Sequence, residues 1–184
     1  MIQYNFGCGN YRKPGFINVD VRGDSAADVV AEAWQIDMFP EGAADAVYSR
    51  HMLEHLDPQD ARRTLSSWWR LLRPGGQLNV IVPDITFHAR QILGLAKGPF
   101  ADQFDHALAG FWGWRDESRG GNREDTHRWG YTEQSLSIEL ALAGFHNISR
   151  VIEGQDSEAW HLNITCSRPS LAVSESDAAD TMVG

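Results

Sequence analysis

The fold is decided by residues 2–20, which read IQYNFGCGNYRKPGFINVD. A short apolar run leads into two glycines, Gly7 and Gly9, and a second apolar run ends in the acid Asp20. Glycine lets a backbone turn sharply and lets a ligand approach it without a Cβ in the way. An acid at the end of the next strand can accept both hydroxyls of a ribose. The stretch therefore predicts two adjacent parallel strands with a nucleoside pocket at their ends.

The spacing inside this loop indicates which nucleoside fits. A dinucleotide fold needs G-x-G-x-x-G opening a helix whose amides hold the pyrophosphate, but the third glycine position is Arg12. Only six residues separate Gly9 from Phe16, one of them Pro14, and a crossover with a helix needs roughly ten or more. We therefore expect an adenosine without phosphates, of which S-adenosylmethionine (SAM) is the common one. The alternative is an ordinary Gly-Pro loop in a hairpin.

Composition narrows the class of protein. We expect residues 1–169 of the 184 to form one domain, large enough to bury about 70% of its unfolded surface. Cys8 and Cys166 lie far apart without C-x-x-C spacing, which indicates a reduced, cytoplasmic setting. The net charge of −9 disfavours a nucleic-acid partner, because such binding rests on clustered Lys and Arg. There is no signal peptide and no 18-residue apolar run, so we expect no membrane segment.

The order of strand and helix patterns predicts a parallel α/β sheet. The best helix pattern starts at Asp57, a candidate cap, with Pro58 at the first helical position and a stop at 74–76. A second begins at Thr132, another candidate cap, and stops at Gly144. The predicted strands are 2–6, 16–20, 27–32, 45–50, 77–84, 146–154 and 159–168, and the predicted helices are 57–73, 85–97 and 132–144.

Two segments do not follow this alternation. Residues 98–131 are rich in Gly, Trp, Phe and charge and show little clean periodicity. Loops this long inside a compact domain are usually lids or binding segments, so we expect a lid or substrate-binding insertion here. Residues 170–184 are small and acidic, with few large apolar side chains, and predict a disordered acidic tail.

Five stretches resemble, in the same order, the class I SAM-dependent methyltransferases of the compact type 11-like family. They are NFGCGN, GFINVD, DAVYSRHMLEHL, LLRPGGQLNVIVPD and SLSIELALAGF, and the resemblance covers about residues 3–168. It implies a Rossmann-like seven-stranded sheet, mostly parallel with the last strand antiparallel, and helices on both faces. It also implies SAM across the carboxyl ends of the first strands. This chain departs from the family in its shortened glycine loop, which lacks a helix.

The resemblance implies a set of SAM-binding residues by position. Asp20 would hold the ribose hydroxyls, and Glu32 would accept the adenine amino group, with Asp37 as its rival. Ser49 and His51, at the end of the fourth strand, would line the methionine end. The full set is Gly7, Cys8, Gly9, Asp20, Val21, Glu32, Ala33, Asp37, Ser49 and His51.

The expected reaction is methyl transfer to oxygen or nitrogen of a small molecule or saccharide. This is an in-line displacement at a sulfonium carbon, so the enzyme's main task is to align the nucleophile and exclude water. Where the acceptor loses a proton, neutral imidazole has a suitable pKa, which makes His51 and His127 candidate catalytic residues. Candidate acceptor-binding residues are His55, Asp84, His88 and Trp112. For each of these a packing or capping role is the alternative.

Residues 51–55, HMLEH, also match H-x-x-E-H, a zinc-protease pattern. That chemistry requires a long helix and a third ligand, and this stretch lies between a strand and Pro58, so we expect no metal. Two other functions stay open. One is a SAM-binding sensor or partner subunit without catalysis. The other is a nicotinamide-dependent enzyme, against which the missing third glycine counts.

Overall fold

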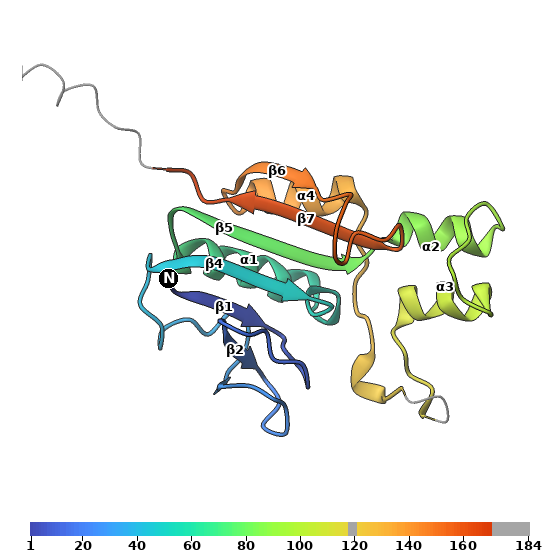
Figure 1. Cartoon of the computed structure of the whole chain (residues 1–184), viewed down its shortest axis with the longest axis horizontal. Helices are drawn as coiled ribbons and strands as arrows, with labels where there is room; N and C mark the ends of the chain where they lie inside the picture. The colour runs from blue at the N-terminus through green and yellow to red at the C-terminus, as the bar shows by residue number, and fades with distance from the viewer. Residues whose placement is uncertain (118–120, 171–184) are drawn as a thin grey trace, which may run out of the picture.

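The structure, a computed structural model, describes residues 1–117 and 121–170. In this part of the chain, seven strands form one sheet in the order β3-β2-β1-β4-β5-β7-β6. Strands β1 to β5 are parallel, and β7 runs antiparallel to both β5 and β6 (Figure 1). The predicted Rossmann-like sheet with an antiparallel last strand is confirmed. The tail predicted for 170–184 lies, after residue 170, outside the described residues.

The strands are β1 (Gln3–Phe6), β2 (Ile17–Asp20), β3 (Val29–Val30), β4 (Ala44–Arg50), β5 (Leu72–Pro83), β6 (His146–Arg150) and β7 (His161–Ser167). The helices are α1 (Pro58–Leu71), α2 (Ile85–Ile92), α3 (Gln103–Trp112) and α4 (Glu133–Leu142), with 3-10 turns η1 (Leu53–His55) and η3 (Arg123–Asp125). No helix among the described residues is both long enough and apolar enough to span a bilayer.

The apolar core lies between one face of the sheet and helices α1 and α4. Helix α1 starts at Pro58, whose missing N–H costs nothing in the first turn, and buries Leu65 and Trp68. The Trp68 ring lies 5.3 Å from that of Phe6 on β1, and its indole N–H donates to the Ala33 carbonyl at 3.0 Å. These contacts fix the chain after β3 against the strands that end at the site.

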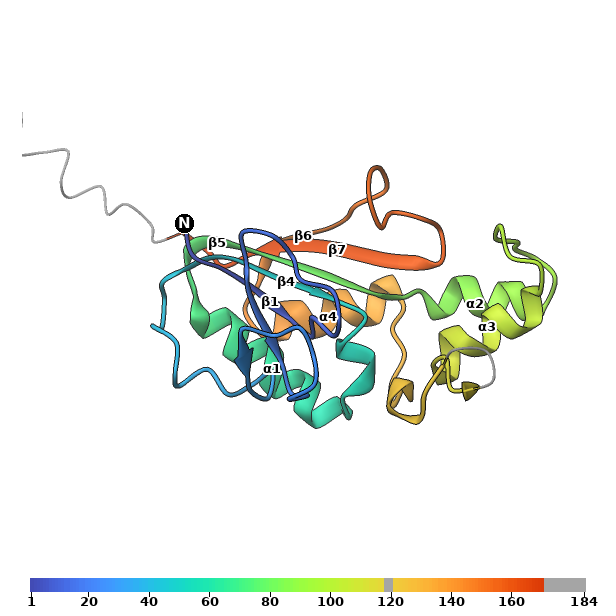
Figure 2. The same cartoon turned by 60° about the horizontal axis from the view of Figure 1, so that its bottom comes forward.

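The opposite face of the sheet is polar and is covered by loops. Figures 1 and 2 show α1 and α4 on one side of the sheet, with α2 and α3 beyond its end. On the other face Asn5 donates to Asn18 at 2.9 Å, and Asn79 donates to Asn163 at 2.6 Å. Among the described residues, the expected helices therefore cover one face only. The loop 7–16 is too short to carry a helix, and an asparagine face does not need an apolar cover.

Other elements differ from expectation at their ends. Strand β5 begins at Leu72, directly after α1, so the predicted breaker at 74–76 lies inside the strand. A Cβ on Gly76 would lie 2.9 Å from the Ala44 carbonyl, which explains a glycine there. Helix α2 ends at Ile92 and not near residue 97, and α3 forms inside the segment expected to lack regular structure.

Candidate functional site

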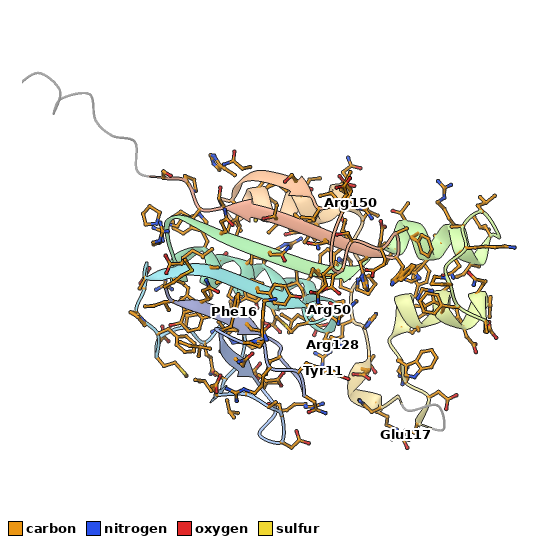
Figure 3. All side chains as sticks on the ribbon, viewed as in Figure 1. Tyr11, Phe16, Arg50, Glu117, Arg128 and Arg150 are labelled. Carbon is orange, nitrogen blue, oxygen red and sulfur yellow. The ribbon has the colours of Figure 1, made fainter. Side chains whose placement is uncertain are left out.

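A cavity of about 930 Å³ opens at the carboxyl ends of β1, β2 and β4. Its wall runs from the glycine loop to residues 123–128, the part of the lid segment that returns to the sheet. Figure 3 shows Arg50 and Arg128 at this end of the sheet. The position agrees with the rule that ligands of parallel sheets bind beyond the carboxyl ends of the strands.

Most of the residues that the resemblance assigned to SAM line one cavity. Those that do are Gly7, Gly9, Asp20, Val21, Glu32, Ala33 and His51. Three others do not line it. Cys8 is buried, and burial raises the pKa of its thiol, while Ser49 is buried in β4 and Asp37 is exposed. Between the two acids proposed for adenine, the geometry favours Glu32.

Asp20 is held in place by the backbone. Its Oδ2 accepts from the Gly9 amide at 2.7 Å, and its Oδ1 accepts from the Arg22 amide at 3.0 Å. The residue is only 8% exposed, yet it lines the cavity. A carboxylate offers about four acceptor positions, so two remain for the hydroxyls of a ribose.

Gly7 is required by its backbone and by its neighbour. Its φ is +73°, in the left-handed region, and its amide donates to the Val19 carbonyl at 2.8 Å. A Cβ at this position would lie 2.3 Å from Cγ of Met52, another cavity residue. Any larger residue would push Met52 toward the space that a cofactor needs.

A row of polar side chains in contact with one another extends from His51, which lines the cavity. His51, with a φ of +50°, places Nδ1 3.1 Å from Oε1 of Glu54. Its Nε2 lies 3.2 Å from Nε2 of His161, whose Nδ1 lies 3.1 Å from Oε2 of Glu158. Because a carboxylate only accepts, His51 and His161 each carry a proton on Nδ1, so the contact between their Nε2 atoms is a hydrogen bond only when one ring holds a second proton. No pattern in the sequence pointed to His161, which is brought here by the antiparallel strand β7.

Glu54 is the buried acid of this region, with 1% of its surface exposed. Burial alone would raise the pKa of its carboxyl group. The hydrogen bond from His51 and the charges of His51, His55 and His127 outweigh burial, and the pKa is lowered. The Oε2 atom of Glu54 has no hydrogen-bond partner among the described residues.

Two histidines connect η1 and Glu54 to the segment that contains residues 126–127. His55 Nδ1 lies 3.1 Å from the Thr126 carbonyl, and His127 Nδ1 lies 3.0 Å from the Gly110 carbonyl. His127 Nε2 lies 4.0 Å from Oε1 of Glu54. Burial is the main cause that lowers the pKa of His127 below its ordinary value. His55 lines the cavity, whereas His127 stands behind it, against Glu54.

The other predicted acceptor-binding residues lie elsewhere. Asp84 caps α2 by accepting from the Thr86 amide at 2.9 Å, and it pairs with Arg150 at 3.0 Å. His88 is buried, and a Cβ on Gly110 would lie 2.3 Å from its ring. Trp112 is exposed on α3, beside a separate shallow hollow. Of the four candidates, only His55 lines the cavity.

Several cavity residues were missed from the sequence. Trp34 follows the predicted Glu32 and Ala33 and could have been found as an aromatic next to an adenine site. Asp60 belongs to the first turn of α1, while Thr126 and Arg128 come from the lid. The lid residues could not be placed from spacing, because only the folded chain brings them to the strand ends.

Comparisons with known proteins agree with this geometry. Residues 13–80 match the family model described as a methyltransferase domain. A SAM-dependent methyltransferase from Methanosarcina mazei shares the fold at 15% identity and a TM-score of 0.58, with 92% of each chain covered. One from Archaeoglobus fulgidus has 14% identity and a TM-score of 0.57, with 90% of this chain and 85% of that chain covered.

A third structure is the 1,6-didemethyltoxoflavin-N1-methyltransferase of Burkholderia thailandensis, with its substrate and S-adenosylhomocysteine bound. It has 17% identity and a TM-score of 0.56, with 92% of this chain and 71% of that chain covered. No curated protein matches the sequence significantly. At this identity the structural likeness shows the fold. Together with the family match, it confirms the predicted resemblance, the enzyme class and the cofactor of that class.

Proposed function

We propose that this class I SAM-dependent methyltransferase moves the methyl group of SAM to an oxygen or nitrogen of a small molecule or saccharide. The observation that carries the proposal is the cavity of about 930 Å³ at the strand ends. It begins at the glycine loop and Asp20, passes His51, and ends under the lid segment at Thr126. Its volume of about 930 Å³ lies near the upper end of ordinary small-molecule sites, which suits a cofactor and an acceptor together.

In this proposal SAM occupies the part of the cavity next to the sheet. Its ribose hydroxyls bind Asp20, its adenine amino group binds Glu32, and its methionine lies along Gly7 toward His51. Asp20 supports this role because two amides already hold its carboxylate. Preorganised acceptors cost little ordering on binding.

The acceptor end is lined by polar side chains, which supports an acceptor with several hydrogen-bonding groups. Asp60, Asp125, Thr126 and Arg128 line it. Both signs of charge are present, so the wall can bind hydroxyl and amino groups without a uniformly basic surface. This, with the net charge of −9, favours a small molecule or saccharide over a nucleic acid. We also propose that residues 98–131 form a lid or substrate-binding insertion. We further propose a cytoplasmic location, which the free thiols of Cys8 and Cys166 support.

His51 is the residue that we propose to contact the acceptor. It lines the cavity, its ring is fixed by Glu54, and in the neutral ring its Nε2, which also lies 3.2 Å from Nε2 of His161, is able to accept. It can therefore receive a hydrogen bond from an acceptor hydroxyl or amine and aim the lone pair at the methyl carbon. His127 acts on this end of the cavity from behind Glu54.

We expect His51→Ala and His127→Ala to lower turnover more than they weaken cofactor binding. General acid–base or aligning groups typically contribute roughly 100-fold or more to rate, whereas neither side chain is assigned to the ribose or the adenine. The measurement is S-adenosylhomocysteine release with a panel of sugar, phenol and amine acceptors. Calorimetric titration of the same variants with S-adenosylhomocysteine measures their affinity for the cofactor product.

The matched control is His146→Gln, because this histidine is exposed on β6 and its side chain is outside the site. Its turnover should equal that of the original chain. Unchanged turnover in both site variants would contradict the role of the histidines. Tight binding of S-adenosylhomocysteine with no turnover on any acceptor would favour the non-catalytic sensor.

A further inference from the structure

The buried carboxyl group of Glu54 has one oxygen without a partner. The residue is 1% exposed, and its Oε2 has no hydrogen-bond partner in the described part of the chain. Among the described residues, the hydrogen bond to its other oxygen, Oε1, comes from His51. A buried polar atom without a partner is costly unless a metal ion or a hydrogen-bond donor satisfies it.

Two imidazoles close to this carboxyl group hold their ring proton on Nδ1. A carbonyl oxygen only accepts, so His55 carries its proton on Nδ1, facing Thr126, and His127 carries its proton on Nδ1, facing Gly110. In the neutral rings both Nε2 atoms are then bare. His127 Nε2 faces Oε1 of Glu54 across 4.0 Å, so two accepting atoms confront each other with no proton between them.

These are the features of a metal site before it binds its ion. Metal-binding histidines usually donate their second ring N–H to a carbonyl or carboxylate, which fixes the ring and the tautomer. One ligand atom from each of Glu54, His55 and His127 lies within 4.8 Å of the other two. Ligands around a tetrahedral zinc ion lie roughly 3.3 Å apart, so the three groups must close by up to about 1.5 Å, which side-chain rotation can supply.

We propose that Glu54, His55 and His127 bind a divalent transition-metal ion, and that Zn²⁺ is an ion this donor set accepts. Two imidazoles and one carboxylate form a known set for catalytic zinc, which leaves a fourth position open. Mg²⁺ and Ca²⁺ prefer oxygen ligands and fit the two imidazoles poorly. The H-x-x-E-H pattern at 51–55 thus contributes its last two members, and the third ligand comes from the lid.

The site borders the acceptor end of the cavity, because His55 lines it. An ion with an open position there would hold an acceptor oxygen and fix the lid by joining η1 to residue 127. This role rests on the proposed function, whereas metal binding itself does not.

A second cluster of similar composition has protein partners for its charged groups and does not require a metal ion. Asp156, Glu158 and His161 also offer three ligand atoms within 4.8 Å of one another. Asp156, however, already accepts from Arg50 Nε at 2.9 Å, and Glu158 is half-exposed and bonds His161. The charges there are matched by protein groups, so this cluster serves as a reference.

The direct test is calorimetric titration of the untagged, chelator-treated full chain with zinc chloride. We expect one ion per chain. His55→Gln and His127→Asn should each weaken zinc binding by more than the roughly 10- to 100-fold typical for loss of an outer-shell partner. His106→Gln is the matched control, because His106 lies in the lid region but bonds Gln91 and not Glu54. It should bind zinc as the original chain does.

A second readout does not depend on affinity. Nitrogen-15 NMR of the histidine rings should show Nε2 of His55 and His127 shifting on zinc addition, with Nδ1 still protonated. A His127 ring protonated on both nitrogens near pH 7 would mean an ordinary ion pair with Glu54 and would overturn the proposal. Equal zinc binding by all variants would also overturn it, as would no binding by the original chain.

The same samples are titrated with S-adenosylhomocysteine. Zinc failing while S-adenosylhomocysteine binds would remove the metal site and leave the proposed function intact. The reverse result would remove the proposed function and leave the metal site.

Discussion

At the scale of single residues, the histidines of this chain differ mainly in their surroundings. His51 and His55 border the cavity, and His127 stands behind them against Glu54. His88 instead lies beneath the lid helix α3, where Gly110 leaves room for its ring. Some histidines therefore border the cavity and others pack in the interior. Their burial and their hydrogen-bond partners distinguish the two groups.

His88 makes stability depend on pH. Burial first, and His106 beside it, lower the pKa of His88 from 6.5 to about 4. Between pH 6.5 and pH 4, His88 is therefore protonated in the unfolded state but not in the folded state. The free energy of unfolding is highest above pH about 6.5 and falls as the pH drops toward 4. We expect this group alone to remove about 2 kcal/mol of unfolding free energy between pH 7.5 and pH 5.

Urea unfolding of the original chain and of His88→Gln at both pH values measures this difference. The loss on acidification should be smaller in His88→Gln, and His146→Gln should retain the full loss because its side chain is exposed. An equal loss in the original chain and His88→Gln would contradict the assigned burial of His88.

At the same scale, position in the sequence predicted some site residues well and others poorly. Asp20 ends β2 and Glu32 follows the neighbouring strand β3 by two residues, and both line the cavity, as the resemblance implied. His161 and Thr126 reach the site only through tertiary contacts of β7 and the lid. Spacing along one chain carries no information about such contacts.

At the scale of elements, the loop between β1 and β2 is the most constrained part of the site. Its first residue, Gly7, combines a φ of +73° with contact to Met52. Gly42 offers a comparison, since its φ is +68° and nothing lies within 4 Å of a Cβ built there. Both glycines would be strained by a Cβ because of their positive φ, but only at Gly7 would the Cβ also collide with a neighbouring side chain.

We expect Gly7→Ala to weaken S-adenosylhomocysteine binding by roughly 5- to 150-fold, which corresponds to the 1–3 kcal/mol of an overpacked site. Gly42→Ala should cost about 1 kcal/mol of unfolding free energy and leave binding unchanged. Calorimetry and urea unfolding on both variants test this. Equal binding by the two variants would mean that Met52 does not border the cofactor.

Elements with strong local signals were predicted well. Helix α1 has apolar residues at helical spacing, and α4 has clear start and stop signals: the Thr132 side chain accepts from the Ser135 amide as a cap should. Helix α3 was missed because it buries only Ala107 and Gly110, too few for a visible period. The polar face was also missed, although Asn5 and Asn18 on adjacent strands were a signal for it.

At the scale of the whole molecule, the sheet and its two supporting helices position one cavity. The strand order places the ends of β1, β2 and β4 around one cavity, and α1 and α4 support the sheet from one face. Residues 126–131 then return between η1 and α2, where the backbone carbonyl of Glu54 accepts from the Arg128 amide at 2.8 Å and the Ile85 amide donates to the Tyr131 carbonyl at 3.1 Å. The cavity and residues 123–131 therefore lie at the same end of the sheet, where we propose that cofactor and acceptor bind.

The central claim is that the cavity closed by Asp20 binds the adenosyl group of SAM. Calorimetric titration of S-adenosylhomocysteine into the original chain, Asp20→Ala and Asp24→Ala tests it directly, since Asp24 is a nearby acid whose side chain is 85% exposed. We expect one site per chain, binding weakened roughly 10- to 150-fold in Asp20→Ala because hydrogen bonds to a charged group are worth about 1.5–3 kcal/mol, and no change in Asp24→Ala. No binding by the original chain, or equal affinity in Asp20→Ala, would contradict the account.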